Sequence, residues 1–309
     1  MRLLRAVGDL LAPRQCVVCG RTLGVQEDEI CIFCEADLPL TRYSSMVHNP
    51  MADRINLLIE RHRADSDREP YAFATSLLFY NSGNAYSRIP QALKYRYKLS
   101  TGRFFARRLA EEMASVAHFA DVDLVTAVPL HWTRRFQRGY NQSEIIAREV
   151  ARGLGVPYRD ILVRVRRTRT QTRLSGEDKS RNVSGAFRLK RSFSAALPSR
   201  LRAASGGVPD QADLPSRLRA AGGEVPDPAD LPSRLRAAGF AGREDGRLHP
   251  GALGSTIPPA GGGVPCHILL VDDTFTTGAT LYACFSALRA ALGPDVRISF
   301  CTIASVTAL

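Results

Sequence analysis

The sequence predicts an α/β fold with a parallel sheet, preceded by a small cysteine-rich domain. Near the C-terminus an apolar segment, Ile268–Val271, a helix pattern, Thr280–Leu292, and a second apolar segment, Val296–Ala304, follow in the order of a parallel β-α-β unit. The chain has 309 residues, of which 45% are hydrophobic and 23% charged, which suggests about two globular domains. No apolar run reaches the ~18 residues that span a bilayer, so no membrane span is expected.

The first residues of the chain are predicted to form a short helix. Apolar side chains recur on one helical face. Charged residues interrupt the apolar stretch within Met1–Asp9, which makes it a poor secretory signal, and a cytoplasmic location is expected.

Residues 1–40 contain two closely spaced cysteine pairs. Cys16 and Cys19 form one C-x-x-C, and Cys31 and Cys34 form a second one, with eleven residues between the two pairs. Two such pairs can complete a tetrahedral site of four thiolates, and four soft ligands without an open position are typical of structural zinc. The alternatives are chance spacing and a single redox-active pair. Residues 1–40 are therefore predicted to be a zinc ribbon.

The middle of the chain, from residue 41 to residue 190, shows helix and strand patterns. Apolar residues spaced by three and four predict one helix: Phe105, Leu109, Met113 and Val116. Leu124–Leu130 is a strand candidate. A second helix is predicted to begin at Asn141, where Asn-x-x-Glu resembles a capping box, and to end near Gly153 or Gly155.

The basic excess of the chain is concentrated in one stretch. The formal net charge is +12, and Arg159–Arg191 has eleven basic and three acidic residues. Such a patch can attract phosphates, although a solvated basic face explains the same residues.

Residues 191–264 differ in kind from the rest. A 17-residue repeat begins at Leu197 and recurs at Leu214 and Leu231, with prolines in each copy and few large apolar side chains. This composition predicts a disordered, low-complexity insertion.

The strongest chemical signal lies in Ile268–Thr280. Four apolar residues precede Asp272 and Asp273, and a loop rich in threonine and glycine then opens a helix. Such a loop can hold a phosphate with backbone N–H groups, hydroxyls and a helix N-terminus, and Gly278 permits a close approach. The two carboxylates would repel a bare phosphate, but they can accept hydrogen bonds from sugar hydroxyls or face a Mg²⁺ held by the ligand. The pattern indicates a phosphorylated ribose, with an ordinary capped strand-turn-helix as the alternative.

This run resembles the phosphoribosyl-pyrophosphate motif of type I phosphoribosyltransferases. Further segments, together with the cysteine ribbon, resemble the ComF family: Ala92–Lys98, Val128–His131 leading to Arg138–Gln142, and Gln171–Thr172 leading to Arg181–Phe187. The resemblance covers about residues 10–190 and 265–305. It implies a type I phosphoribosyltransferase domain made of residues 41–190 and 265–309, with a parallel sheet flanked by helices.

The resemblance also implies a ligand and roles for individual residues. Type I phosphoribosyltransferases bind phosphoribosyl pyrophosphate with Mg²⁺ and transfer the ribosyl group to a nitrogen nucleophile. Asp272 and Asp273 would be the catalytic residues that contact the ribose. The pyrophosphate loop would be Leu130, His131 and Trp132, and the 5′-phosphate would be held by Thr274, Thr276, Thr277, Gly278, Ala279 and Thr280.

Four basic residues are candidate contacts with ligand or DNA: Lys94, Lys98, Arg135 and Arg181, the last within an expected flexible lid, Thr170–Val183. Each of them could instead be merely solvated. ComF proteins are associated with natural competence and the uptake of single-stranded DNA, so single-stranded DNA and the DNA-uptake machinery are expected partners. The alternatives are a non-catalytic single-strand-binding module regulated by phosphoribosyl ligands and a nucleobase-salvage phosphoribosyltransferase.

Overall fold

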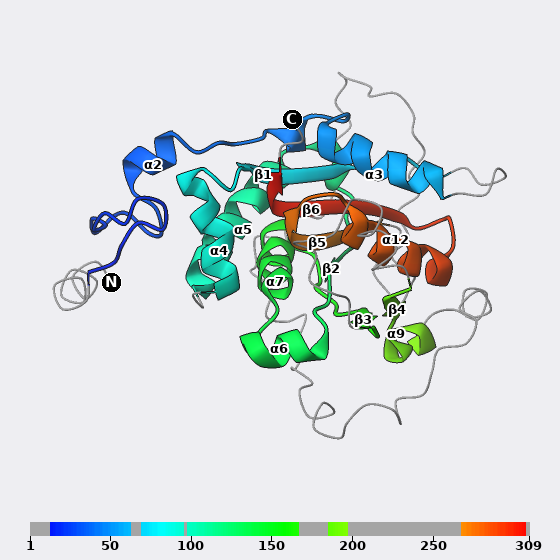
Figure 1. Cartoon of the computed structure of the whole chain (residues 1–309). Coiled ribbons are helices and arrows are strands. Elements are labelled where there is room, and N and C mark those ends of the chain that lie inside the picture. Colours follow the sequence, from blue (N-terminus) through cyan, green and yellow to red (C-terminus); the bar gives the residue numbers. More distant parts are fainter. Residues whose placement is uncertain (1–12, 63–68, 96–97, 167–184, 197–266, 307–309) are drawn as a thin grey trace, which may run out of the picture. The chain divides into compact units, whose positions relative to one another are not determined.

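The centre of the protein is a parallel sheet of four strands in the order β1-β6-β5-β2. The computed structural model describes residues 13–62, 69–95, 98–166, 185–196 and 267–306, which all belong to one compact unit. The strands are β1 (Ala74–Tyr80), β2 (Leu124–Ala127), β5 (His267–Phe275) and β6 (Arg297–Val306). The predicted α/β class with a parallel sheet is confirmed (Figure 1).

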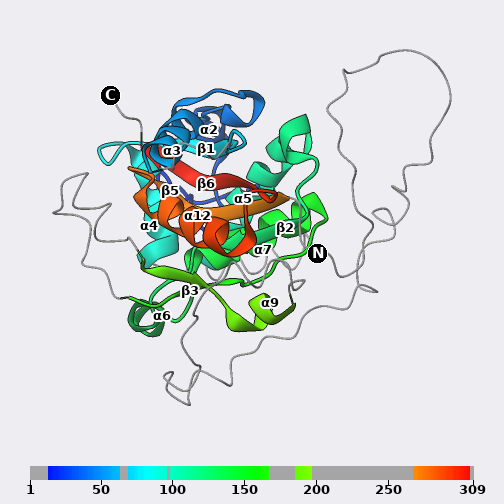
Figure 2. The same cartoon turned by 90° about the vertical axis from the view of Figure 1, so that its right-hand side faces the viewer.

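Helices cover both faces of this sheet (Figures 1 and 2). One face packs against α5 (Leu99–Ala114) and α7 (Gln142–Leu154), and the other against α3 (Pro50–Arg61) and α12 (Ala279–Leu292). Successive side chains of a strand alternate between faces. Accordingly Leu269 and Val271 belong to the first core and Ile268 and Leu270 to the second. A strand buried on both faces reads as the continuous apolar run seen in the sequence.

Shorter elements surround these layers. An antiparallel pair, β3 (Leu162–Arg164) with β4 (Phe187–Leu189), packs near α12. The remaining helices are α2 (Ile32–Ala36), α4 (Arg88–Tyr95), α6 (Trp132–Arg138) and α9 (Arg191–Ala196), with 3₁₀ turns at Tyr43–Ser45, Ala85–Ser87 and Ala117–Phe119.

Two strand boundaries differ from the prediction for identifiable reasons. The strand predicted over Leu124–Leu130 ends at Ala127, because Pro129 has no N–H to continue the ladder after Val128 donates to the carbonyl of Val271. Conversely, β5 runs past the predicted end at Val271 to Phe275, because the long strand β6 continues to pair with it. The acidic pair therefore lies inside the strand rather than after it.

Helix boundaries agree more closely with the sequence. Phe105, Leu109 and Met113, the first three residues of the predicted helix pattern, are buried on α5. The predicted N-cap of α7 is confirmed, since Asn141 Oδ1 accepts a hydrogen bond from the Ser143 N–H at 3.2 Å. Glu144, the second half of the predicted capping box, instead pairs with Arg148 at 3.0 Å. Gly155, at φ 72°, ends the helix.

Several sequence predictions lie outside the described residues. They include the N-terminal helix, the segment around Arg181 and the repeats; of the segment assigned to the insertion, the structure describes only α9 at its start. Within the described part of the chain, no helix is both long enough and apolar enough to cross a membrane.

Candidate functional site

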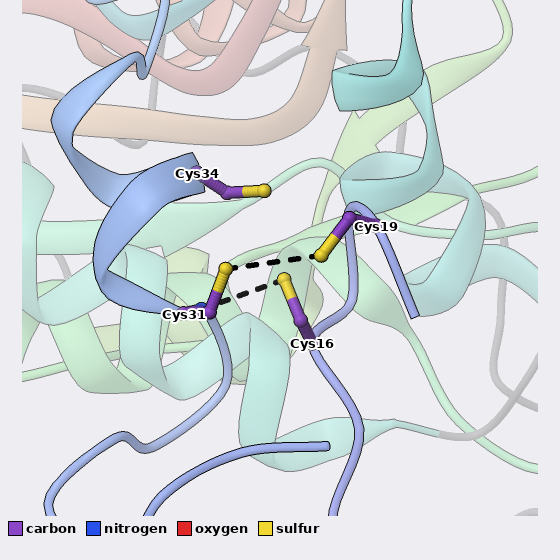
Figure 3. Close-up of side chains that lie close together, drawn as sticks. All are labelled: Cys16, Cys19, Cys31 and Cys34. Carbon is purple, nitrogen blue, oxygen red and sulfur yellow. Dashed lines mark hydrogen bonds between the residues drawn. The ribbon is translucent and has the colours of Figure 1, made fainter. Parts of the chain in front are cut away.

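The four N-terminal cysteines converge on one point (Figure 3). The sulfur atoms of Cys16, Cys19, Cys31 and Cys34 all lie within 4.8 Å of one another. Cys19 Sγ is 3.7 Å from Cys31 Sγ, whereas a disulfide bond measures about 2.05 Å. Two thiolates on one tetrahedral zinc, each with a Zn–S bond of about 2.3 Å, lie roughly 3.8 Å apart. The cluster is positioned to bind a structural zinc.

The electrostatics of the cluster favour a cation. Burial raises the pKa of Cys16, but backbone N–H groups of Cys19, Cys31 and Val18 outweigh it and lower that pKa to about 7. At Cys34, burial and the neighbouring thiols together raise the pKa. Four thiols in this space cannot all ionise without a compensating charge, and a divalent metal supplies one.

The cysteine cluster is attached to the α/β unit through α4 and α5. Arg88 at the start of α4 donates to the Val18 carbonyl at 2.7 Å, between the cysteines of the first pair. Thr101 on α5 donates to Glu29 at 2.7 Å. Apolar residues around the cysteine cluster, including Val18 and Ile30, belong to the same core as the first face of the sheet. The cysteine cluster therefore contacts the N-terminal end of α4.

The second site lies at the carboxyl end of β5. Strand β2 pairs with β5 only as far as Val271, and beyond it Asp272–Phe275 pair with β6. The edge of Asp272–Phe275 that does not pair with β6 faces the segment that follows β2. Ligands of open α/β sheets bind at this end of the strands.

Lys94, at the last turn of α4, reaches this end of β5. Its Nζ lies 3.2 Å from Asp273 Oδ2 and donates to Thr274 Oγ1, also at 3.2 Å. Burial lowers the pKa of Lys94, but the charges of Asp273 and Asp272 outweigh it, so the pKa is raised and the ammonium is retained. The structure thus brings a predicted cation together with one of the predicted carboxylates.

Asp272 is half-buried and is held by two hydrogen bonds. Its Oδ1 accepts from the Ser143 hydroxyl at 2.7 Å and from the Asp273 N–H at 2.8 Å. Burial, and after it the charge of Asp273, raises the pKa of Asp272 to about 7, against the opposing effect of these hydrogen bonds. Its proton is therefore exchangeable near neutral pH, as is common for functional carboxyl groups.

The predicted phosphate loop forms the turn between β5 and α12. Thr274 lies within the strand, Thr276 and Thr277 in the turn, and Ala279 and Thr280 in the first turn of α12. Gly278 is the N-cap at φ 80°, a left-handed conformation that disfavours a side chain. The first N–H groups of a helix have no partner within it and can bind an anion.

The predicted pyrophosphate loop follows β2 and leads into α6. His131 is buried and is the N-cap of this helix, with Nδ1 2.9 Å from Thr133 Oγ1. Trp132 is exposed, and Leu130 is half-buried. The structure assigns His131 a capping role, one of the roles that its position next to the strand end allows.

The remaining candidate cations lie in different places. Lys98 lines a cavity of about 270 Å³ beside Cys16 and Arg88, next to the cysteine cluster. Arg135 on α6 is 3.6 Å from Glu144 and half-exposed. Arg181 lies outside the described residues.

Two site residues were not found by reading the sequence. Ser143 holds Asp272, and the charge of Asp272 reaches Arg164 on β3. Ser143 directly follows Asn141-Gln142. A hydroxyl in the first turn of a helix that starts near the sheet edge could have identified Ser143 as a candidate site residue. Nothing local in the sequence distinguishes Arg164 from the other arginines of the basic stretch.

Comparison with known proteins bears out the resemblance. The chain is 24% identical to competence protein F of Haemophilus influenzae over 179 residues, which are 57% of this chain and 76% of that protein. It is 32% identical over 102 residues to the DNA utilization protein YhgH of Salmonella typhimurium, and 36% over 69 residues to YhgH of Escherichia coli. These matches cover 45% and 30% of the two YhgH proteins, less than half of each. No family model matches the chain.

Proposed function

We propose that the carboxyl end of β5 binds phosphoribosyl pyrophosphate with Mg²⁺, and that the protein uses this site in the handling of DNA during competence. The observation that supports this ligand is the convergence of Lys94, Asp272 and Asp273 beside a glycine-capped helix. It combines acceptors for sugar hydroxyls, a cation and a helix N-terminus suited to phosphate at one end of β5. A phosphorylated ribose offers the complementary groups.

Each part of the site has a role in this proposal. The N–H groups at the start of α12 and the hydroxyls of Thr276, Thr277 and Thr280 bind the 5′-phosphate. Asp272 and Asp273 accept hydrogen bonds from the ribose hydroxyls. Lys94 already holds a positive charge next to them and is within reach of an anionic ligand.

If turnover occurs, the chemistry is displacement at the ribose. The bond from C1 to the pyrophosphate oxygen breaks, pyrophosphate leaves with the electron pair, and a nitrogen nucleophile bonds to C1 and loses a proton. Bound Mg²⁺ would neutralise charge on the leaving pyrophosphate. The protein's own contribution is fixed charge at this place, which stabilises the transition state without reorganisation.

The DNA role is supported by the named functions of the relatives and by charge. Competence protein F and YhgH are named for competence and for DNA utilization. The net charge of +12 favours polyanionic partners. Single-stranded DNA, with the DNA-uptake machinery, is the partner that we propose, in the cytoplasm.

Titration calorimetry of phosphoribosyl pyrophosphate with Mg²⁺ tests the site. We expect wild type to bind, and Asp272→Asn/Asp273→Asn to bind at least about tenfold more weakly, because two charged acceptors are lost. Asp295→Asn is the matched control, since Asp295 is exposed on the turn between α12 and β6. Equal binding by the double variant, or no binding by wild type, would show that the assignment is wrong.

A further inference from the structure

Helix α6 exposes two aromatic side chains to solvent. Trp132 is 54% exposed and Phe136 is 88% exposed. They are four residues apart on a helix and therefore lie on the same face. Large exposed rings are costly to leave in water, and two on one short helix indicate a contact surface. We call Trp132 and Phe136 the α6 ring pair.

The surroundings of the α6 ring pair are basic. Arg134, Arg135 and Arg138 share the helix, and no acidic residue occurs between Asp123 and Glu144. Arg135 meets Glu144 at 3.6 Å but remains 48% exposed, and an ion pair this exposed contributes little and is readily exchanged. Rings interleaved with arginines are the arrangement that holds single-stranded nucleic acid, with bases on the rings and phosphates on the cations.

Helix α6 also has a defined place relative to the proposed phosphoribosyl site. It begins directly after the segment that follows β2, and Figure 1 shows it beyond the start of α7, whose Ser143 holds Asp272. Arg138 at its end donates to Gln142 of α7 at 3.2 Å. The ring pair is thus attached to the rim of that site while facing solvent.

We propose that the α6 ring pair is a base-stacking platform for single-stranded DNA. This inference rests on the proposed function, because it names the surface with which the protein contacts its DNA partner. Charge selects the occupant: a strand brings both unstacked bases and phosphates to a helix that carries three arginines and no acidic residue, whereas an apolar protein surface would match only the rings.

The chain offers a direct probe, because Trp132 is its single tryptophan. Titration with an oligothymidylate is expected to quench the intrinsic fluorescence. An abasic strand of equal length, which keeps the phosphates and lacks the bases, and a duplex are expected to leave it nearly unchanged. Quenching by the abasic strand to the same extent would show that phosphates alone are bound and would overturn stacking.

Substitution of Phe136 tests the platform while keeping the fluorescent reporter. Phe136→Ala is expected to weaken oligothymidylate binding by roughly 5- to 100-fold, the range for loss of one stacked base, and Phe136→Tyr to restore it. Phe33→Ala is the matched control, since Phe33 is also an exposed ring, 68% exposed, with Arg21 4.8 Å from its centroid. Equal affinity of Phe136→Ala and wild type would overturn the proposal.

Two further readouts separate this proposal from others. Phe136→Ala is expected to bind phosphoribosyl pyrophosphate like wild type, so a failed platform and a failed phosphoribosyl site give different results. Sedimentation of wild type and Phe136→Ala shows whether a second copy of the chain covers the ring pair. A dimer that the substitution abolishes, with DNA binding unchanged, would assign the surface to self-association instead.

Discussion

Asp272 and Asp273 are adjacent in the chain but lie in different surroundings. Asp273 meets Lys94 of α4, whereas Asp272 lies near Cys284 of α12, where burial and after it the charge of Asp272 raise the pKa of the thiol. Only Asp273 has a cation at 3.2 Å. Asp272 is held by the Ser143 hydroxyl instead, and its charge is the less compensated of the two.

This difference predicts a pH-dependent stability effect at Asp272. Its pKa is 3.8 in the unfolded chain and about 7 in the folded protein, so the stability is highest below about pH 4, falls as the pH rises from 4 to 7, and stays low above that range. Asp272→Asn removes that loss. We expect its melting temperature to exceed that of wild type by roughly 2–4 °C at pH 8, for about 1 kcal/mol, and by less at pH 5.

Thermal melts of both proteins at the two pH values measure the effect. Asp295→Asn, on an exposed turn, serves as the control and is expected to melt like wild type. A difference between Asp272→Asn and wild type that is larger at pH 5 than at pH 8 would contradict the raised pKa.

At the scale of elements, the junction of β5 and α12 depends on one glycine. Gly278 has φ 80°, and a Cβ there would lie 3.1 Å from both Leu58 Cδ1 and Phe275 Cε2. The left-handed conformation costs a non-glycine residue about 1–2 kcal/mol, and the two contacts add to it. The turn that forms the proposed phosphate site therefore requires glycine because of its backbone conformation and packing, independently of any ligand.

Gly278→Ala is accordingly expected to destabilise the protein by about 1–3 kcal/mol in denaturant unfolding. Gly83→Ala is the control, because a Cβ at Gly83 meets only Asn81 Oδ1 at 3.7 Å. We expect the control to stay within about 0.5 kcal/mol of wild type. Equal stability of the two variants would show that the turn tolerates a side chain.

Helix α4 connects the two sites of the molecule. Arg88 at its start donates to the Val18 carbonyl between the cysteines of the first pair, and Lys94 at its end contacts Asp273 and Thr274. A displacement of the cysteine cluster would be transmitted along a helix of eight residues. The cysteine cluster and the contact of Lys94 with Asp273 thus lie at the two ends of one helix.

For the whole molecule, we predict about one zinc per chain, measured by elemental analysis of the purified protein. Cys34→Ser is expected to lose the metal and to melt at a lower temperature, because the packing of Val18 and Ile30 against the main core depends on the cluster. Cys301→Ala, at a buried cysteine of β6 outside the cluster, should keep the zinc. A wild-type protein that is purified without zinc, or that melts at the same temperature after its zinc has been removed, would contradict a structural zinc.

Much of the fold was predictable because its signals are local. The β5–α12–β6 unit follows from apolar runs, a glycine and a helix pattern, and the four-cysteine cluster follows from two spacings. Strand ends were predicted less well. The length of β5 depends on β6, a partner strand whose pairing does not appear in the local pattern.

The sequence by itself determined the class of fold, the cysteine cluster and the acid-threonine-glycine run, since each depends on residues only a few positions apart. Only the tertiary structure decided which distant residues surround that run. Lys94 is 180 residues from Thr274, and Ser143 is 129 residues from Asp272. It likewise decided that Trp132 and Phe136 face solvent. The physical reason is that such contacts arise from the packing of helices on a sheet, whereas local periodicity specifies which face of a helix is apolar but not which distant residue it meets.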